Sequence, residues 1–434
     1  MTLSAYFDLE RLHTTASREV IAGSTTFVTM AYIIVVNPKI LEAAGMPFGP
    51  SMVATILTAF LGSLLMGVYA RRPFAVAPYM GENAFVAFTV VKLLGYSWQT
   101  ALGAVFISGL IFAVLTILKI RTWLVNAIPE KLKIGFSVGV GLFLTFIGLN
   151  ETGIVSVGIP GAPVRVGDLG EPPVILGICG FVITGILMLR QVKGAIFLGI
   201  VGVTAIAAML GLVNLPASLL SAPPSVAPVF AQLDIAGAMR VEALPIVLVM
   251  LVMIFVDTMG TLIGVSFKAG FLDSEGNLPK IEQPMLCDSL ATMAGAVIGT
   301  TASGAYIESA TGIEAGGRSG LASVTTALLF LSALFFAPVF AIVPPYAYGP
   351  SLIIVGMLML SPIQRLDFQD LTDVIPVFTV IALMSFTYNI GIGMTAGFVI
   401  YPVIKLGAGR VREVSGGLWF LWFLSVLFYI FYPY

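Results

Sequence analysis

Two acidic side chains of this 434-residue chain stand inside strongly apolar segments, Asp257 in Phe-Val-Asp-Thr-Met and Glu308 in Tyr-Ile-Glu-Ser-Ala. A similar segment precedes each of them by about 226 to 228 residues, at 27–30 and at 80–84. A carboxyl group inside a membrane is costly and is functional by default. It can accept hydrogen bonds from adjacent N–H groups of a neutral planar molecule, or it can bind and release a proton. The repeated spacing predicts a transporter built from two related halves.

The composition places the chain in a membrane. It is 58% hydrophobic and only 10% charged, with a mean hydropathy of +1.04, which is far more apolar than a soluble core requires. Long runs such as 101–118 lack the alternation of a membrane β-barrel, so we expect helices of about 20 residues surrounded by lipid. The net charge of −1 offers no basic surface, which excludes nucleic acid as a partner.

Neither catalysis nor a metal site is predicted. The chain has one histidine, His13, and two cysteines, Cys179 and Cys287, in or beside apolar segments. This set forms neither a zinc site nor a Ser/His/Asp or Cys/His arrangement, and we expect no cofactor. Acidic and polar residues fill 5–19, so we expect no signal peptide and a first apolar run that stays as a helix.

We count fourteen apolar segments before Gly407. With a cytoplasmic N-terminus, 17 of the 21 Lys and Arg residues fall on the inside and 4 on the outside, as the positive-inside rule predicts for a multi-pass protein of the cell inner (plasma) membrane. Seven segments per half is an odd number, so the second half enters the membrane with the opposite orientation, and the repeats are inverted. The segments are 19–37, 50–69, 74–92, 98–118, 132–149, 174–190, 194–213, 242–266, 284–299, 301–316, 319–342, 349–361, 372–388 and 391–405.

Segments three and ten are too broken to be continuous helices. The third carries Pro73, Pro78 and Gly81, and the tenth begins with the small and polar run 299–304. Extended backbone at that depth is tolerated only where protein or a wet cavity covers it, and half-helices that begin there offer free N–H groups. We therefore predict an all-α polytopic fold with discontinuous segments 3 and 10, where short strands are possible, and a substrate site between them. The segment 416–432 is left open between a fifteenth span and an interfacial anchor rich in Trp and Tyr.

Four motifs make the chain resemble the nucleobase-ascorbate transporter superfamily (nucleobase:cation symporter family 2), in its adenine/guanine/hypoxanthine, azaguanine-sensitive purine permease branch. They stand in order along most of the chain, and four long motifs in order are a specific signal. They read REVIAGSTTFVTMAY at 18–32, followed by Asn37 and Pro38, MGENAF at 80–85, FVDTMGT at 255–261, and YIESATG at 306–312 with GGRSG at 316–320.

The resemblance implies a core domain at 1–125 and 236–342, and a gate domain at 126–235 and 343–434 that includes the C-terminal segment. It also implies uptake of a purine coupled to protons, by an elevator-type movement of the core against a gate that forms a homodimer. Two features depart from the family. The run 303–305 replaces a Thr-rich stretch of many relatives, which leaves the purine preference open, and the segment after Lys405 has no counterpart in the smaller uracil-permease architecture.

Glu308, Asp257 and Asn83 are expected to contact the substrate directly. Glu308 begins a half-helix and can accept two parallel hydrogen bonds from the N–H edge of a purine; alternatively, it caps its own helix. Asp257 suits the binding and release of a proton, or bonds to the base; alternatively, it ties to Thr29 or Thr26. Asn83 can both donate and accept, as recognition of a purine requires; alternatively, it caps its half-helix.

Further residues are expected around these three. Glu82 is assigned either to proton coupling, with Asp257 and Glu308, or to a hydrogen bond within the core domain. Thr261 lies one turn past Asp257 and is expected to line the pocket. Four other positions are expected beside the ligand, the glycines as close-approach or positive-φ sites and the aromatic residues as stacking surfaces or core: Gly81, Gly304, Phe85 and Tyr306.

Three other classes of protein are weaker alternatives. An anion exchanger on the same inverted repeat would bind its substrate with helix N-termini alone, but two acidic side chains repel anions. An intramembrane aspartyl protease needs a second catalytic aspartate, and Asp257 has no obvious partner in the membrane. A channel fits broken half-helices around a closed pocket less well than alternating access does. The choice among purines, and between proton and sodium coupling, stays open at this point.

Overall fold

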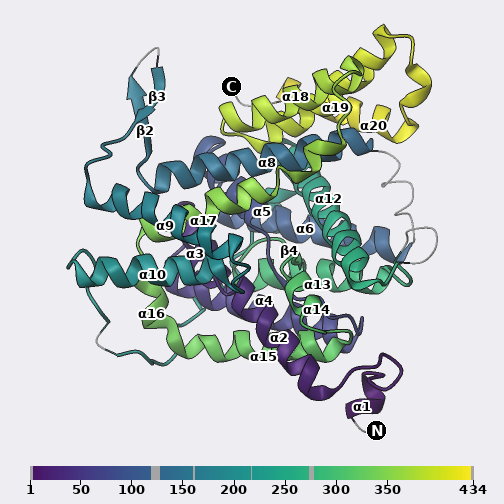
Figure 1. Cartoon of the computed structure of the whole chain (residues 1–434). Coiled ribbons are helices and arrows are strands. Elements are labelled where there is room, and N and C mark those ends of the chain that lie inside the picture. The colour runs from purple at the N-terminus through teal and green to yellow at the C-terminus, as the bar shows by residue number, and fades with distance from the viewer. Residues whose placement is uncertain (1–2, 119–127, 160–161, 217, 273–277, 432–434) are drawn as a thin grey trace.

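Helices dominate the computed structural model, which describes residues 3–118, 128–159, 162–216, 218–272 and 278–431 (Figure 1). Nine helices in that part of the chain are long and apolar enough to cross a membrane. Others are shorter, such as α10, α13 and α18 with 15, 17 and 16 residues. Each of the fourteen predicted segments coincides with a helix, a helix pair, or a strand followed by a helix. The prediction of an all-helical polytopic membrane protein is therefore confirmed.

The elements of the first half follow the predicted order. Polar caps begin several of them, for example Thr15 before α2 and Ser97 before α6. They are α1 (Leu3–Tyr6), α2 (Ala16–Met30), α3 (Ile33–Glu42), α4 (Phe48–Val68), β1 (Val76–Pro78), α5 (Met80–Ala84), the π-helix η1 (Phe85–Leu93), α6 (Trp98–Ile117), α8 (Glu130–Glu151), β2 (Val155–Ile159), β3 (Ala162–Val166), α9 (Pro172–Leu189), α10 (Ala195–Met209) and α11 (Ile235–Ala238).

The second half repeats this pattern without the β2–β3 hairpin and ends with one further helix. Its elements are η2 (Val241–Ala243), α12 (Leu244–Ala269), α13 (Glu282–Ile298), β4 (Ser303–Ala305), α14 (Ser309–Glu314), α15 (Gly320–Ala333), η3 (Leu334–Phe336), α16 (Ala337–Ala341), α17 (Pro345–Leu358), η4 (Ser361–Arg365), α18 (Leu371–Phe386), α19 (Ile390–Gly407), η5 (Val411–Glu413) and α20 (Gly416–Phe431).

The two broken segments meet at an antiparallel pair of short strands, β1 and β4, in the middle of the molecule (Figure 1). The helix that precedes each strand clamps it with one hydroxyl group. Ser63 of α4 bonds to both the N–H (2.9 Å) and the C=O (3.1 Å) of Val76. Thr292 of α13 does the same to Ser303, at 3.1 Å and 2.8 Å. Because the same clamp occurs at equivalent places in the two halves, the breaks are a repeated feature of the fold.

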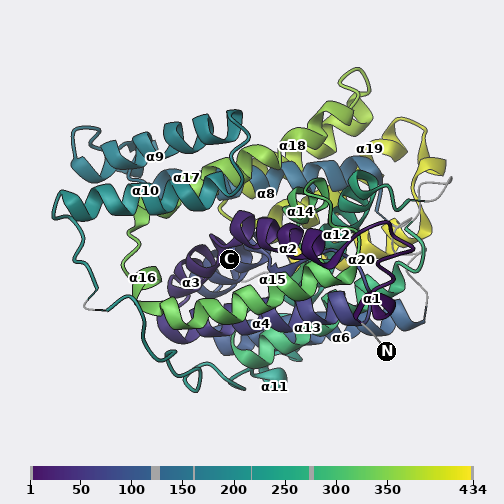
Figure 2. The same cartoon turned by 60° about the horizontal axis from the view of Figure 1, so that its bottom comes forward.

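The helices pack in two groups. In one, α15 lies against α4 and α2, and α13 lies against α6 and α4, with α12 beside α6. In the other, α8 packs against α17 and α18, α18 against α19, and α9 and α10 against α17. Figure 1 shows α8, α18 and α19 above α2, α4 and α15, and Figure 2 shows α9 and α10 on the outer side of α17. The first group thus contains α2, α4, α6, α12, α13 and α15, and the second contains α8, α9, α10, α17, α18 and α19.

Helices α4 and α15 touch backbone to backbone at a pair of glycines. A Cβ added at Gly320 would lie 2.0 Å from the carbonyl oxygen of Gly67, and one added at Gly67 would lie 2.5 Å from the carbonyl oxygen of Gly320. We therefore expect Gly320→Ala to destabilise the protein by about 2 kcal/mol and to lower its melting temperature in detergent. Gly202→Ala on α10, where a Cβ would meet nothing within 4 Å, is the matched control and should leave the melting temperature unchanged or slightly higher. Equal melting temperatures of the two variants would contradict the packing described here.

The C-terminal helix α20 runs back along α19. The Tyr429 hydroxyl donates to the carbonyl of Ile392 at the start of α19, 2.9 Å away. At the other end of α19, buried Lys405 pairs with Asp373 (2.7 Å) and Glu413 (2.9 Å). The part of 416–432 that the structure describes is thus a helix packed against α19.

Candidate functional site

The candidate site lies where the β1–β4 crossing meets α12. Glu308 directly precedes α14, and Asp257 and Thr261 lie in the middle of α12. All three side chains are partly exposed. Glu82 and Asn83 lie on α5, immediately after β1, and are fully buried. The fold brings the predicted polar residues of both halves to one region.

A tyrosine from the first half holds Glu308. The Tyr32 hydroxyl, between α2 and α3, donates a hydrogen bond of 2.6 Å to Glu308 Oε1. The Glu308 side chain does not cap α14, so the alternative in which it binds its own helix is wrong. A carboxylate with one oxygen so bonded still has lone pairs for further donors. Glu308 is therefore oriented, partly exposed, and able to accept hydrogen bonds from a ligand.

Asp257 faces Glu82 rather than the threonines of the first segment. The carboxyl groups of Asp257 and Glu82 are close enough to interact electrostatically, although neither oxygen of Glu82 meets the geometry of a hydrogen bond with a described residue. The hydroxyl of Thr29 lies instead 3.0 Å from that of Thr311. Glu308, Glu82 and Asp257 all act electrostatically on the Tyr306 hydroxyl, so the three acids lie in one region.

The face of α12 that carries Asp257 is open. Gly260 is exposed, and neither Gly260 nor Gly264 has a described atom within 4 Å of where a Cβ would stand. This face consists of small and polar residues, Asp257, Gly260, Thr261 and Gly264, whereas a face in contact with lipid is apolar. A Cβ added at Gly391 of α19 would lie 3.3 Å from Phe85 Cε2 and 3.7 Å from Val249 Cγ2, so α19 packs close to the N-terminal half of α12.

Asn83 is held by a second asparagine that the sequence reasoning did not single out. Its Nδ2 donates to Oδ1 of Asn37 on α3, and no side chain caps α5, so the capping alternative for Asn83 is wrong. Asn37 also bonds to Thr55 and Thr300. A polar residue inside the first apolar segment was the available signal for Asn37, but its partners lie in three other segments.

The predicted glycines and aromatic residues pack the crossing itself. A Cβ at Gly304 would lie 2.2 Å from Tyr79 Oη, and one at Gly81 would lie 2.9 Å from Val140 Cγ1, so both are close-approach positions, and neither is among the glycines with positive φ. The Tyr306 ring lies parallel to that of Tyr79, with centroids 6.1 Å apart. The Tyr306 hydroxyl donates to the carbonyl of Pro78, and Phe85 is buried.

Asp288 is a buried aspartate that the sequence reasoning overlooked. It lies on α13, fully buried, and Oδ2 accepts a hydrogen bond of 3.1 Å from the N–H of Ala305 in β4. An acid inside an apolar segment was the same signal that identified Asp257. Asp288 is thus a second aspartate within an apolar segment, and its hydrogen bond goes to the β4 backbone rather than to Asp257.

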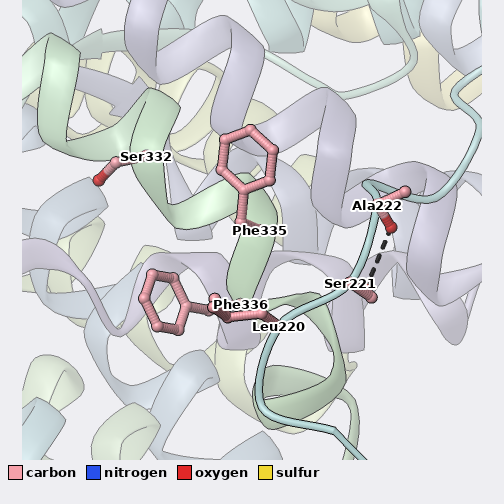
Figure 3. A pocket seen from close by; sticks show the side chains of 6 residues that line it. All are labelled: Leu220, Ser221, Ala222, Ser332, Phe335 and Phe336. Atoms are coloured by element: carbon pink, nitrogen blue, oxygen red, sulfur yellow. Dashed lines mark hydrogen bonds between the residues drawn. The ribbon is translucent and has the colours of Figure 1, made fainter.

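A separate apolar pocket of about 590 Å³ lies between the loop at 220–222 and the end of α15 (Figure 3). Phe335 and Phe336 form much of its lining, and the N–H of Ser221 donates to the carbonyl of Phe335. It shares no residue with the site around Glu308. In the described residues, no group of three or more His, Cys, Asp or Glu side chains is arranged to hold a metal ion.

Comparison with known proteins gives close matches over the whole chain. A model described as the permease family matches residues 17–398. The chain is 45% identical to a putative permease of Methanocaldococcus jannaschii, over 99% of this chain and 98% of that protein. It is 42% identical to the adenine permease AdeP of Escherichia coli, over 95% and 92%. It is 39% identical to the guanine/hypoxanthine permease PbuG of Bacillus subtilis, over 99% and 100%.

Among solved structures, the chain is similar to transporters of the predicted architecture. The transmembrane domain of the cyanobacterium bicarbonate transporter BicA matches with a TM-score of 0.63 at 15% identity, over 88% of this chain and 97% of that one. The structure of SLC26A9 matches with a TM-score of 0.64 at 10% identity, over 90% and 65%. At such low identity the likeness shows the fold alone. It confirms the prediction of a 7+7 inverted-repeat transporter.

Proposed function

Because this chain belongs to the permease family, whose members are transporters and not enzymes, we propose that it imports a purine base together with protons. The names of its relatives support the substrate class, since they include an adenine permease and a guanine/hypoxanthine permease. The observation that carries the proposal is Glu308, an oriented and partly exposed carboxylate at the β1–β4 crossing. Purines are neutral and planar, and they carry N–H groups that can donate hydrogen bonds to such a carboxylate.

In the proposed site, Glu308, Asp257 and Asn83 contact the base, and Thr261 lines the pocket one turn from Asp257. Tyr306, Gly304, Gly81 and Phe85 shape the crossing around it. Asp257 takes up and releases the coupling proton. Glu82, which lies beside Asp257, and Glu308 are the other acids that take part. The support is their placement, because all three acids act electrostatically on the Tyr306 hydroxyl and Asp257 lies on the partly exposed face of α12 that carries Gly260 and Gly264.

The proposed movement is of elevator type. The helices of 1–125 and 236–342 form the moving core domain, and those of 126–235 and 343–434 form the gate through which two copies associate. The separate packing of the two groups of helices supports this division. We place the protein in the inner (plasma) membrane with its N-terminus in the cytoplasm.

Anion exchange on the same fold is the rival function. A bicarbonate transporter is among the structures that share the fold, but at 15% identity this does not transfer a substrate. Three acidic side chains in one region repel an anion and favour a neutral base.

The experiment that tests the proposal is uptake into proteoliposomes that contain the purified protein. Labelled hypoxanthine is competed with adenine, guanine, xanthine, sulfate and bicarbonate, with and without an inward proton gradient and with and without sodium. We expect purines alone to compete and the proton gradient to drive accumulation. Competition by bicarbonate or sulfate, with none by purines, would replace the proposal with anion exchange.

A further prediction concerns the tyrosine that holds Glu308. Tyr32→Phe removes a hydrogen bond to a charged group, worth about 1.5–3 kcal/mol, so we expect kcat/KM for uptake to fall by about 10- to 100-fold. Tyr348→Phe is the matched control, because the Tyr348 hydroxyl donates to Glu151 at 2.7 Å, away from the site. If both variants transported at the same rate, Tyr32 would have no role in orienting the site.

A further inference from the structure

Asn37 determines the orientation of the side-chain amide of Asn83. It lies on α3, fully buried, and its Nδ2 donates to Thr55 Oγ1 at 2.6 Å and to Thr300 Oγ1 at 3.0 Å. An amide nitrogen carries two hydrogens, so both are used. The Asn37 side chain therefore has only its carbonyl oxygen left for another partner.

The direction of this arrangement is fixed by Thr55. Its hydroxyl donates its single hydrogen to the carbonyl of Ser51, at 2.7 Å, so it can only accept from Asn37. The nitrogen of Asn37 must face Thr55, and Oδ1 of Asn37 must face Asn83. Asn83 in turn must present its nitrogen to that oxygen.

The side-chain carbonyl oxygen of Asn83 is thereby left without a hydrogen-bond partner in this arrangement. Oδ1 of Asn83 is buried and has no hydrogen-bond partner among the described residues. A buried polar atom without a partner costs about 1–3 kcal/mol, and a ligand N–H that binds there removes this cost. Asn83 lies on α5, which packs against α12, the helix that carries Asp257, so this oxygen lies close to the acids of the site.

We propose that Asn37 and Thr55 are positioning residues that hold Asn83 with its carbonyl oxygen available to the substrate, so that the site selects a purine with an N–H group at that point. This rests on the proposed function and adds a basis for discrimination among purines. Adenine offers an exocyclic NH₂ beside a bare ring nitrogen, whereas hypoxanthine offers an oxygen beside a ring N–H. A fixed carbonyl distinguishes these two patterns, whereas an amide that is free to rotate accepts both.

The test compares wild type with Thr55→Val and Asn37→Leu in the proteoliposome assay. Inhibition constants are measured for adenine, hypoxanthine and the N-methylated hypoxanthines, each of which lacks one N–H group. A site built to bond a substrate N–H rejects an analogue without it by orders of magnitude. The ratio of the inhibition constants of two bases measures how well the site discriminates between them. We expect the largest such ratio found for wild type to fall by about 10-fold or more in both variants, because the Asn83 amide is then free to turn. Thr55→Ser, which keeps the hydroxyl, should retain the wild-type ratio.

The control for a general loss of packing is Thr326→Val. Thr326 is equally buried and bonds to the carbonyls of Gly23 and Ala322, without contact to Asn37. It should leave every ratio unchanged. Ratios that stay within about twofold of wild type in Thr55→Val would overturn the proposal, as would a wild type that takes all these bases equally. If Asn37→Leu does not fold, the result for Thr55→Val decides alone. For a variant that binds the base without transporting it, displacement of bound labelled base replaces the uptake measurement. Absence of purine uptake by wild type would instead overturn the proposed function.

Discussion

Glu308→Gln should lower purine uptake by about 100- to 1000-fold while leaving a folded protein. Glutamine keeps the shape of the side chain and can still accept the Tyr32 hydrogen bond through its carbonyl oxygen. It replaces the other carboxylate oxygen with an NH₂ group that opposes the N–H groups of the base. A charge-assisted hydrogen bond worth about 1.5–3 kcal/mol is lost, and a donor then faces a donor, which together give the expected magnitude. The measurement is initial uptake of labelled hypoxanthine into proteoliposomes, with the melting temperature and gel-filtration profile as the test of folding.

The chain offers a close control for this variant. Glu151 also accepts a tyrosine hydroxyl, that of Tyr348, at 2.7 Å, but it ends α8 in the other group of helices. Glu151→Gln should keep uptake within about threefold of wild type. Normal uptake by Glu308→Gln would remove the central contact of the proposed site.

Asp257→Asn is expected to separate transport of the base from its coupling to protons. Asparagine has the shape of the protonated acid and cannot release a proton, so the variant should lose accumulation driven by a proton gradient and the dependence of uptake on external pH. Exchange of labelled for unlabelled base across the membrane should continue, because it needs no net proton movement. The measurement is uptake between pH 5 and pH 8, together with counterflow at constant pH.

Asp168→Asn, in the exposed turn after β3, is the control and should keep the pH profile of wild type. An unchanged profile in Asp257→Asn would reassign the coupling proton. Glu82 is then the next candidate, because it is the carboxyl group that interacts with Asp257.

The spans and their breaks could be predicted because hydropathy and proline placement are local properties of the sequence. Nine helices in the described part of the chain are long and apolar enough to cross a membrane, and the broken third and tenth segments contain β1 and β4. Glu308, Asp257 and Asn83 could be identified because acids and amides are rare inside apolar segments. Asp288 gave the same signal, and a consistent application of the rule would have found it.

The partners of these residues could not be predicted in the same way. Tyr32 bonds to Glu308 across 276 residues, and Asn37 bonds to Thr300 across 263. A tyrosine or threonine in an apolar helix is compatible with many environments, so its type does not indicate which distant group it meets. The hydroxyl clamps of Ser63 and Thr292 also depend on how the two halves cross, which no single segment determines.

The most direct measurement is a structure of the protein determined with its transported purine. The account predicts the base beside the β1–β4 crossing, with its N–H groups about 2.7–3.2 Å from the Glu308 carboxylate and with Tyr32 still bonded to Oε1. A base bound elsewhere, for instance in the apolar pocket beside Phe335, with Glu308 bonded to Tyr32 alone, would contradict it.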